Sequence, residues 1–163
     1  FSIHTLLRLN PLTTHILLVQ DDCEFSTGLR EHVEQNMPQD FGVLSLYTAA
    51  PLHSPVVGFH ENDQVFFVGW GALAYVFKAA EAAQFSIWGQ QWINNATYMP
   101  DYWVGQWCFQ TGRKYLMHSP SFVLHTGIES AIGYKWNQHR RQCLEWISDC
   151  KHLSKYESDL NLL

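Results

Sequence analysis

The sequence predicts a single α/β domain with a mainly parallel sheet flanked by helices. Short apolar runs typical of buried strands alternate along the chain with longer segments of helical pattern. Of the 163 residues, 47% are hydrophobic and only 15% are charged, which is enough apolar material for a core and excludes a disordered chain. We expect one domain over residues 1–163, with a core at about 14–150 and a tail at 151–163.

In the first part of the chain, a helix is predicted over residues 1–8. It should end at Asn10-Pro11, because proline disfavours helical geometry in the residue before it. A buried strand is predicted at 15–19. Ser26 or Thr27 is then expected to cap a helix that runs to about Gln35.

Later strands and turns follow from the same patterns. Four further runs rich in β-branched, aromatic and leucine residues are predicted to be strands: 41–47, 64–68, 114–118 and 122–125. Residues 48–63 hold two prolines and two histidines and are expected to form a long loop. Gly69-Trp70-Gly71 is expected to be a tight turn.

Three later segments are predicted to be helices. The alanine-rich segment 72–83 should place Phe77 in the core. The next helix should begin at Pro100-Asp101, with Asp101 as its cap, and end at Gly112. The last is expected over 136–151.

Composition excludes several classes of protein. The formal net charge is −5 and there is no basic tract, so sequence-independent binding to nucleic acid is not expected. No apolar run reaches the roughly 18 residues of a membrane span. Four cysteines are too few for a disulfide scaffold at this length, and they leave the compartment open.

An acidic pair, Asp21-Asp22, directly follows the first predicted strand. Ligands of α/β sheets bind beyond the carboxyl ends of strands, and carboxylates suit hard cations such as Mg²⁺ or Mn²⁺. The alternative is a turn that leads into a helix, where Asp22 and Glu24 would favour the positive N-terminus. Spacing alone leaves both interpretations open.

Two further residues each have two possible roles, one structural and one chemical. Asp101 is either a helix cap or a general base, and these roles can coexist. His125 is either a satisfied structural histidine or a metal ligand held by a second partner.

Glycine and aromatic residues surround these candidates. The Gly69-Trp70-Gly71 turn permits close backbone approach to a ligand, although the match to a phosphate loop is weak. Tryptophan and tyrosine faces suit the apolar faces of sugar rings, which makes Tyr102 and Trp103 candidates for acceptor binding.

The order of these motifs resembles that of metal-dependent glycosyltransferases of the GT-A fold, notably the N-acetylglucosaminyltransferase IV group and related microbial and phage enzymes. A strand ends in Gln20-Asp21-Asp22, and a Gly-Trp-Gly-Ala turn follows. Pro100-Asp101-Tyr-Trp-Val-Gly105 then precedes Pro120-Ser-Phe-Val-Leu-His125-Thr-Gly. The likeness covers roughly residues 14–133, and the histidine stretch after Asp101 is its more specific element.

The resemblance implies a GT-A-like, Rossmann-like fold and a metal-dependent, inverting transfer. Asp22 and His125 would bind Mn²⁺ or Mg²⁺, which would bridge the donor diphosphate. Asp21 would assist through the metal shell or the donor ribose, and Asp101 would take the proton of the acceptor hydroxyl. The turn at 69–71 would lie near the donor.

The resemblance also implies the partners. The donor would be a nucleotide sugar such as a UDP-sugar, carrying a hexosyl or N-acetylhexosaminyl group, and the acceptor a glycan, a protein or a modified base. The family has an upstream half that holds the nucleotide base, so we expect this chain to lack part of that half.

Two alternatives remain from the sequence. An inactive or truncated domain of this fold could bind glycan or protein through its aromatic residues. A metal-dependent phosphoesterase would need more acids or histidines clustered near Asp22 than the sequence holds.

Overall fold

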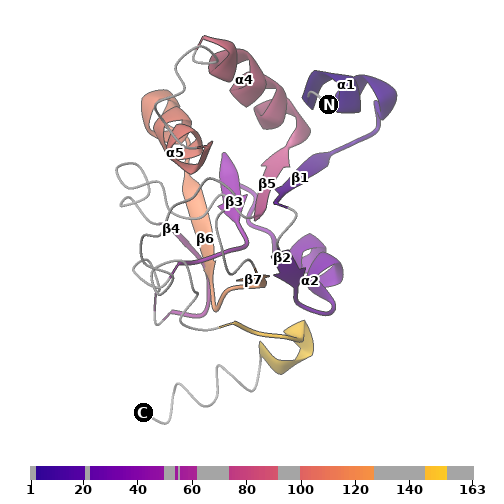
Figure 1. Cartoon of the computed structure of the whole chain (residues 1–163), viewed down its shortest axis with the longest axis vertical. Helices are drawn as coiled ribbons and strands as arrows, with labels where there is room; N and C mark the ends of the chain where they lie inside the picture. Colours follow the sequence, from indigo (N-terminus) through magenta and orange to yellow (C-terminus); the bar gives the residue numbers. More distant parts are fainter. Residues whose placement is uncertain are drawn as a thin grey trace.

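The computed structural model describes residues 3–20, 23–49, 54, 56–61, 74–91, 100–126 and 146–153, with the side chains of Pro100 and Asp101 outside this description. The described elements, in chain order, are α1 (Ile3–Leu9), β1 (His15–Val19), β2 (Cys23–Phe25), α2 (Leu29–Asn36), β3 (Val43–Ser45), β4 (Gly58–Glu61), β5 (Ala74–Lys78), α4 (Ala79–Gln90), α5 (Pro100–Thr111), β6 (Tyr115–Ser119), β7 (Val123–His125) and a 3₁₀ helix (Cys150–His152). The chain is therefore of the α/β class, as predicted (Figure 1).

The main sheet is mixed rather than mainly parallel. Its five described strands have the order β1-β5-β3-β6-β4, and β3–β6 is the one parallel pair among them. β1, β3 and β6 nevertheless run in the same direction, because β1 and β3 are both antiparallel to β5. The helix α2 lies between β1 and β3 in the chain, as expected for a crossover. The prediction of a mostly parallel sheet is wrong because β4 and β5 are inserted in the reverse direction.

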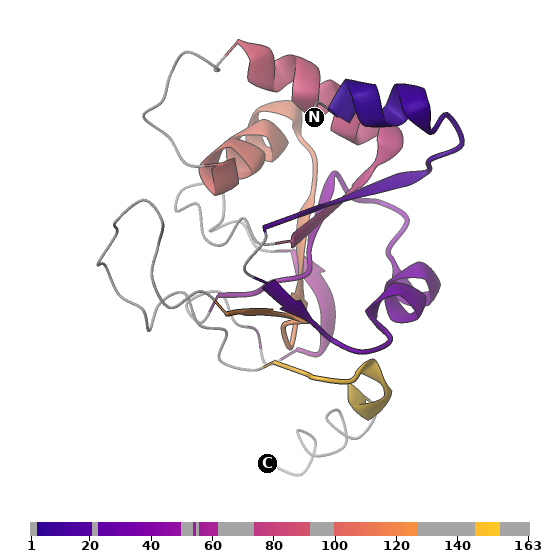
Figure 2. The same cartoon turned by 45° about the vertical axis from the view of Figure 1, so that its right-hand side comes forward.

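The sheet has a hydrophobic core on each face. Successive residues of β5 point to opposite faces, so Val76 belongs to one buried cluster and Phe77 to the other. The Val76 cluster includes Val33 of α2 and Ile147. The Phe77 cluster includes Trp107 of α5 and residues of α1 and α4. Figures 1 and 2 show α1, α4 and α5 gathered at one end of the molecule, with α2 nearer the other.

The predicted helix at 72–83 is a strand followed by a helix. Residues Ala74–Lys78 form β5, and α4 begins only at Ala79. Tyr75, Val76 and Phe77 are β-formers. In β5 all three pair with β1, and Tyr75 and Val76 also pair with β3. Pairing on both edges and burial on both faces outweigh the helix propensity of the flanking alanines. The expected burial of Phe77 is confirmed, but from a strand.

Strand β1 has the predicted bounds but is not buried. It lies at the edge of the described sheet and pairs with β5. Ile16 is its buried residue, whereas Leu17 and Val19 are 49% and 50% exposed. An apolar run therefore predicted the strand correctly without predicting its position in the sheet.

Two expectations concern the region between β3 and β5. The predicted loop at 48–63 contains an edge strand, β4, which pairs with β6. The strand predicted at 64–68 and the turn Gly69-Trp70-Gly71 lie outside the described residues.

Helix ends depend on glycine more than on the predicted caps. Helix α2 begins after Gly28, which has a left-handed φ of 75°. No side chain caps the N-terminus of α2, so the predicted cap at Ser26 or Thr27 is wrong. Helix α5 ends before Gly112 (φ 66°), as predicted. There the Arg113 N–H donates to the Cys108 carbonyl (2.9 Å), which closes the helix in a Schellman motif.

The start of α5 differs from the prediction by one position. Pro100 opens the helix and Asp101 follows it inside the first turn, so Asp101 is not the cap that precedes a helix. An acidic residue in this turn still favours the helix, because the N-terminus carries a partial positive charge.

The predicted helix at 136–151 is wrong where the structure describes it. In the described segment 146–149, Trp146 bridges to Ser121 and Asp149 to Thr27, and a 3₁₀ helix begins only at Cys150. The Ile147 N–H donates to the Ser121 carbonyl, 3.1 Å away. These long-range hydrogen bonds replace the local ones that a helix would use. Among the described residues, no helix is long and apolar enough to span a membrane.

Candidate functional site

The short ladder of β2 and β7 brings together two parts of the candidate site. The strands are antiparallel, and Cys23 pairs directly with His125. Directly opposed residues of such a ladder point to the same face, with Cβ atoms about 4.5–5.5 Å apart. Both side chains are half-buried, so this end of the ladder is neither core nor fully exposed surface.

The acidic pair Asp21-Asp22 lies outside the described residues. Its flanks are described: β1 of the main sheet ends at Val19, and β2 begins at Cys23. The residue that follows Asp22 in the chain is thus the one paired with His125. That Asp22 and His125 share one metal ion stays a prediction.

The residues around the candidate base lie on α5. Asp101 is in its first turn, and Tyr102 and Trp103 follow it, both half-buried. The ring of Trp103 packs edge to face against Trp88 of α4, with centroids 6.4 Å apart. Figures 1 and 2 place α5 beside α4, at a different level along the long axis from β7. The part of α5 that carries Tyr102 and Trp103 therefore lies at a different level of the described structure from the β2–β7 ladder.

Two further predictions concern the donor turn and the cluster of metal ligands. The donor turn Gly69, Trp70 and Gly71 lies outside the described residues. Within the described ranges, no group of three or more histidine, cysteine, aspartate or glutamate side chains could hold a metal ion. A metal site built on His125 would need ligands from residues that the structure does not describe, and Asp22 is the one predicted from the sequence.

Sequence analysis missed a buried histidine at the end of β6. The His118 ring stacks on Phe122 at 3.9 Å between centroids and meets Phe59 edge to face at 4.8 Å. Its Nδ1 donates to the Pro120 carbonyl, 2.8 Å away, across the turn that leads to β7. The sequence feature that could have indicated it is a histidine at the end of a short apolar run, which is a position typical of a buried strand end.

Burial lowers the pKa of His118 to about 4, against the hydrogen bond to Pro120, which raises it. The neighbouring imidazoles of His32 and His60 act in the same direction as burial. His32 comes from α2, with its ring centroid 5.9 Å from that of His118, and its own pKa is lowered by burial. His118 is therefore neutral at neutral pH, and its ring packs against those of Phe122 and Phe59.

Acid should destabilise the fold through His118. The unfolded side chain takes up a proton near its ordinary pKa of 6.5, whereas the folded one does so only near 4. Its contribution to stability is thus fully present above about pH 6.5 and is lost as the pH falls towards 4, by at most about 3 kcal/mol. Urea unfolding measured between pH 7 and 4.5 gives this slope.

A matched pair of variants assigns the slope to His118. His118→Asn keeps a donor near the Nδ1 position and should flatten the pH dependence. A smaller slope should remain, because burial also lowers the pKa of His32 and of His15. His4→Asn, at an exposed position of α1, should keep the parent slope. An unchanged slope in His118→Asn would contradict this account.

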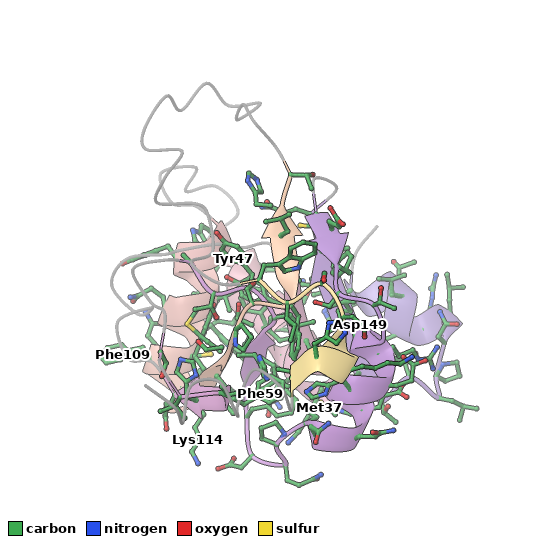
Figure 3. All side chains as sticks on the ribbon, turned by 90° about the horizontal axis from the view of Figure 1, so that it is seen from below. Met37, Tyr47, Phe59, Phe109, Lys114 and Asp149 are labelled. Carbon is green, nitrogen blue, oxygen red and sulfur yellow. The ribbon has the colours of Figure 1, made fainter. Side chains whose placement is uncertain are left out.

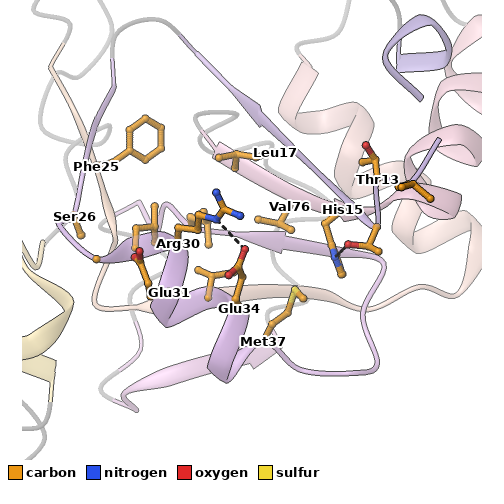
Figure 4. Close-up of a pocket in the computed structure, with 16 residues that line it drawn as sticks. Thr13, His15, Leu17, Phe25, Ser26, Arg30, Glu31, Glu34, Met37 and Val76 are labelled. Carbon is orange, nitrogen blue, oxygen red and sulfur yellow. Dashed lines mark hydrogen bonds and ion pairs between the residues drawn. The ribbon is translucent and has the colours of Figure 1, made fainter. Parts of the chain in front are cut away.

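A cavity of about 950 Å³ lies between α2 and the edge strand β1 (Figure 4). Apolar residues such as Leu17 and Val33 line it, together with the exposed ion pair of Arg30 with Glu34 (Nε–Oε1 2.9 Å). Among the described candidate residues, none lines this cavity. It therefore lies apart from the end of the ladder that carries His125.

The chain was also compared with known proteins. No protein-family model and no curated protein sequence matches it.

Proposed function

We propose that this chain is a metal-dependent glycosyltransferase that moves a sugar from a nucleotide-sugar donor to an acceptor hydroxyl with inversion. One observation carries the proposal: β2 pairs with β7 so that His125 lies opposite Cys23, the residue that follows the acidic pair. The order of the motifs along the chain indicates the class of reaction. The register brings the segment that follows the acidic pair next to the segment that carries His125.

The residues proposed for the metal fit a hard or borderline cation. Asp22 would provide carboxylate oxygen and His125 imidazole nitrogen, a donor set that suits Mn²⁺ or Mg²⁺. Asp21 would bind a water of the metal shell or the donor ribose. A bound cation supplies Lewis-acid stabilisation of the negative charge on the diphosphate leaving group.

The other residues hold the acceptor and move its proton. The Asp101 carboxylate accepts the proton of the attacking hydroxyl, and the first turn of α5 holds its backbone in place. The acceptor would bind against the aromatic faces of Tyr102 and Trp103. The ring of Trp88 packs against that of Trp103 and holds it in position. The backbone of Gly69 to Gly71, with Trp70, would approach the donor sugar.

Metal binding by the full chain tests the proposal. Titration with Mn²⁺, followed by calorimetry or electron paramagnetic resonance, should show a site that Asp22→Asn and His125→Ala each weaken at least about tenfold. Loss of a group that only supports a ligand already costs 10–100-fold. Glu31→Gln is the matched control, because Glu31 is an exposed carboxylate of α2 and lies outside the β2–β7 ladder.

The outcomes separate the proposal from its alternatives. Unchanged Mn²⁺ affinity in both ligand variants would remove the metal site. Mn²⁺ binding without transfer from any nucleotide sugar would favour a module that binds glycan or protein.

A further inference from the structure

The outer edge of β1 directs backbone hydrogen-bonding groups away from the sheet. The Ala79 N–H donates to the Thr14 carbonyl at 2.8 Å, which continues the register of β1 on β5 by one pair. Because hydrogen-bonded pairs alternate along an antiparallel ladder, every second residue of β1 bonds to β5. The other three direct their N–H and C=O groups outward: His15, Leu17 and Val19. Among the described residues, no strand pairs with this edge.

Apolar side chains accompany this outer edge. Leu17 lines the cavity between α2 and β1, and Val19 lies on the same face of β1 (Figure 4). Leu12 and Phe25 also line the cavity and are 93% and 37% exposed. With residue areas of about 170–240 Å², these four side chains expose on the order of 450 Å², a size at which apolar patches are often functional.

The other edge of the described sheet is protected, whereas β1 is not. β4 begins at Gly58, with a left-handed φ of 114°, and ends at the exposed Glu61. A distorted backbone and a charged residue are devices that keep an edge strand from pairing with another chain. The sequence of β1, His-Ile-Leu-Leu-Val, contains no charged residue, proline or glycine. This edge is therefore suited to accept a further strand.

A second copy of β1 fits this edge. In an antiparallel pairing about a twofold axis at Leu17, Leu17 lies opposite its counterpart and His15 lies opposite Val19. All three residues direct their backbone outward, so each pair exchanges both of its hydrogen bonds. Burial and, to a smaller extent, Lys78 lower the pKa of His15, so its imidazole is neutral at neutral pH. No like charges therefore oppose each other across the paired strands.

The exposed apolar area matches what a dimer needs. A standard interface buries about 800 Å² per partner, and a little more than half of it, about 450 Å², is non-polar. The four side chains around the outer edge expose about this much. A second copy paired along β1 lies beside the cavity, so it can cover these side chains as well as the backbone.

We propose that two copies of this chain associate through β1, in an antiparallel pairing about Leu17 that joins their sheets into one. The surface is built from described residues of β1 and of the adjacent cavity, and it does not depend on the proposed function. Because the paired strands are short, we expect a weak dimer with a Kd on the order of 10–100 µM.

Sedimentation equilibrium of the full chain over a range of concentrations tests the association. Leu17→Lys should weaken the dimer at least about 100-fold, because two ammonium groups would face each other across the axis. Ile87→Lys is the matched control, since Ile87 is an apolar residue of α4 with 61% exposure. It should leave the Kd within about twofold. Urea unfolding of both variants shows that the fold is kept, as expected for exposed positions.

A proline variant tests the backbone pairing. Val19→Pro removes an N–H that faces the outer edge, and the β1–β5 ladder loses no hydrogen bond. Each dimer would lose two donors, so its Kd should rise about tenfold above that of Val19→Ala, which keeps the N–H. An equal Kd in these two variants would contradict pairing through the backbone.

Disulfide trapping tests the register. The Cα atoms of two directly opposed residues lie about 5.5 Å apart, within reach of a disulfide, whereas position 19 lies far from its counterpart. In a chain with Cys23→Ser and Cys143→Ser, Leu17→Cys should therefore crosslink two copies at least about tenfold faster than Val19→Cys. Cys108 and Cys150 are buried.

Three outcomes would overturn the proposal. The first is a parent chain that stays monomeric up to about 0.5 mM, which would leave the edge to a strand of another polypeptide. The second is a dimer that Leu17→Lys does not weaken, because its interface would then lie elsewhere. The third is equal crosslinking at positions 17 and 19, which would exclude the axis at Leu17.

Discussion

Asp101→Asn is expected to lower turnover with a nucleotide-sugar donor by about 10²–10⁴-fold, because the amide cannot accept the proton of the acceptor hydroxyl. The fold should persist. Asp101 lies inside the first turn of α5, where loss of its charge costs about 0.3–1 kcal/mol through the helix dipole. Release of the nucleoside diphosphate, measured at saturating donor, gives the rate.

A matched variant separates chemistry from helix stability. Glu31→Gln removes an acidic residue from the first turn of α2 and should have a similar small effect on stability with no effect on turnover. Donor affinity should be unchanged in both variants. Full turnover in Asp101→Asn would remove Asp101 from the mechanism.

Phe77→Ala is expected to lower the free energy of unfolding by about 3–5 kcal/mol, as for other fully buried phenylalanines. The Phe77 side chain is 0% exposed. Its ring stacks on Phe85 at 5.4 Å between centroids and contacts Trp107 at 6.1 Å. Truncation would leave a cavity between the sheet and α4 and α5, since rings this closely packed relax only in part. Urea unfolding at neutral pH measures the change.

Phe109→Ala is the control for this prediction. Phe109 lies on α5 and is 56% exposed, and Figure 3 shows it at the edge of the molecule. Its replacement should change the free energy of unfolding by less than about 0.5 kcal/mol. A cost below about 1 kcal/mol for Phe77→Ala would contradict the core position of that ring.

Candidate residues for the site could be named from the sequence, but how the chain brings distant segments together could not be predicted. Asp22, Asp101 and His125 were chosen by residue type and motif order. Nothing local indicated that β2 exists or that Cys23 pairs with His125, because the two strands come from distant parts of the chain. The buried environments of Ser26 and His118 were missed for the same reason, since both depend on partners far away in sequence.

The sequence by itself determined the features that depend on neighbouring residues. The proline at position 11 and Gly112 mark helix ends, because they restrict or extend the backbone angles at their own positions. Apolar runs gave the bounds of β1 and the places of β6 and β7. Only the tertiary structure decided that Tyr75 to Phe77 form a strand between β1 and β3, and that residues 146–149 bridge to two other segments. In both cases backbone hydrogen bonds to distant partners, together with burial, outweigh helix propensities of less than about 1 kcal/mol per residue.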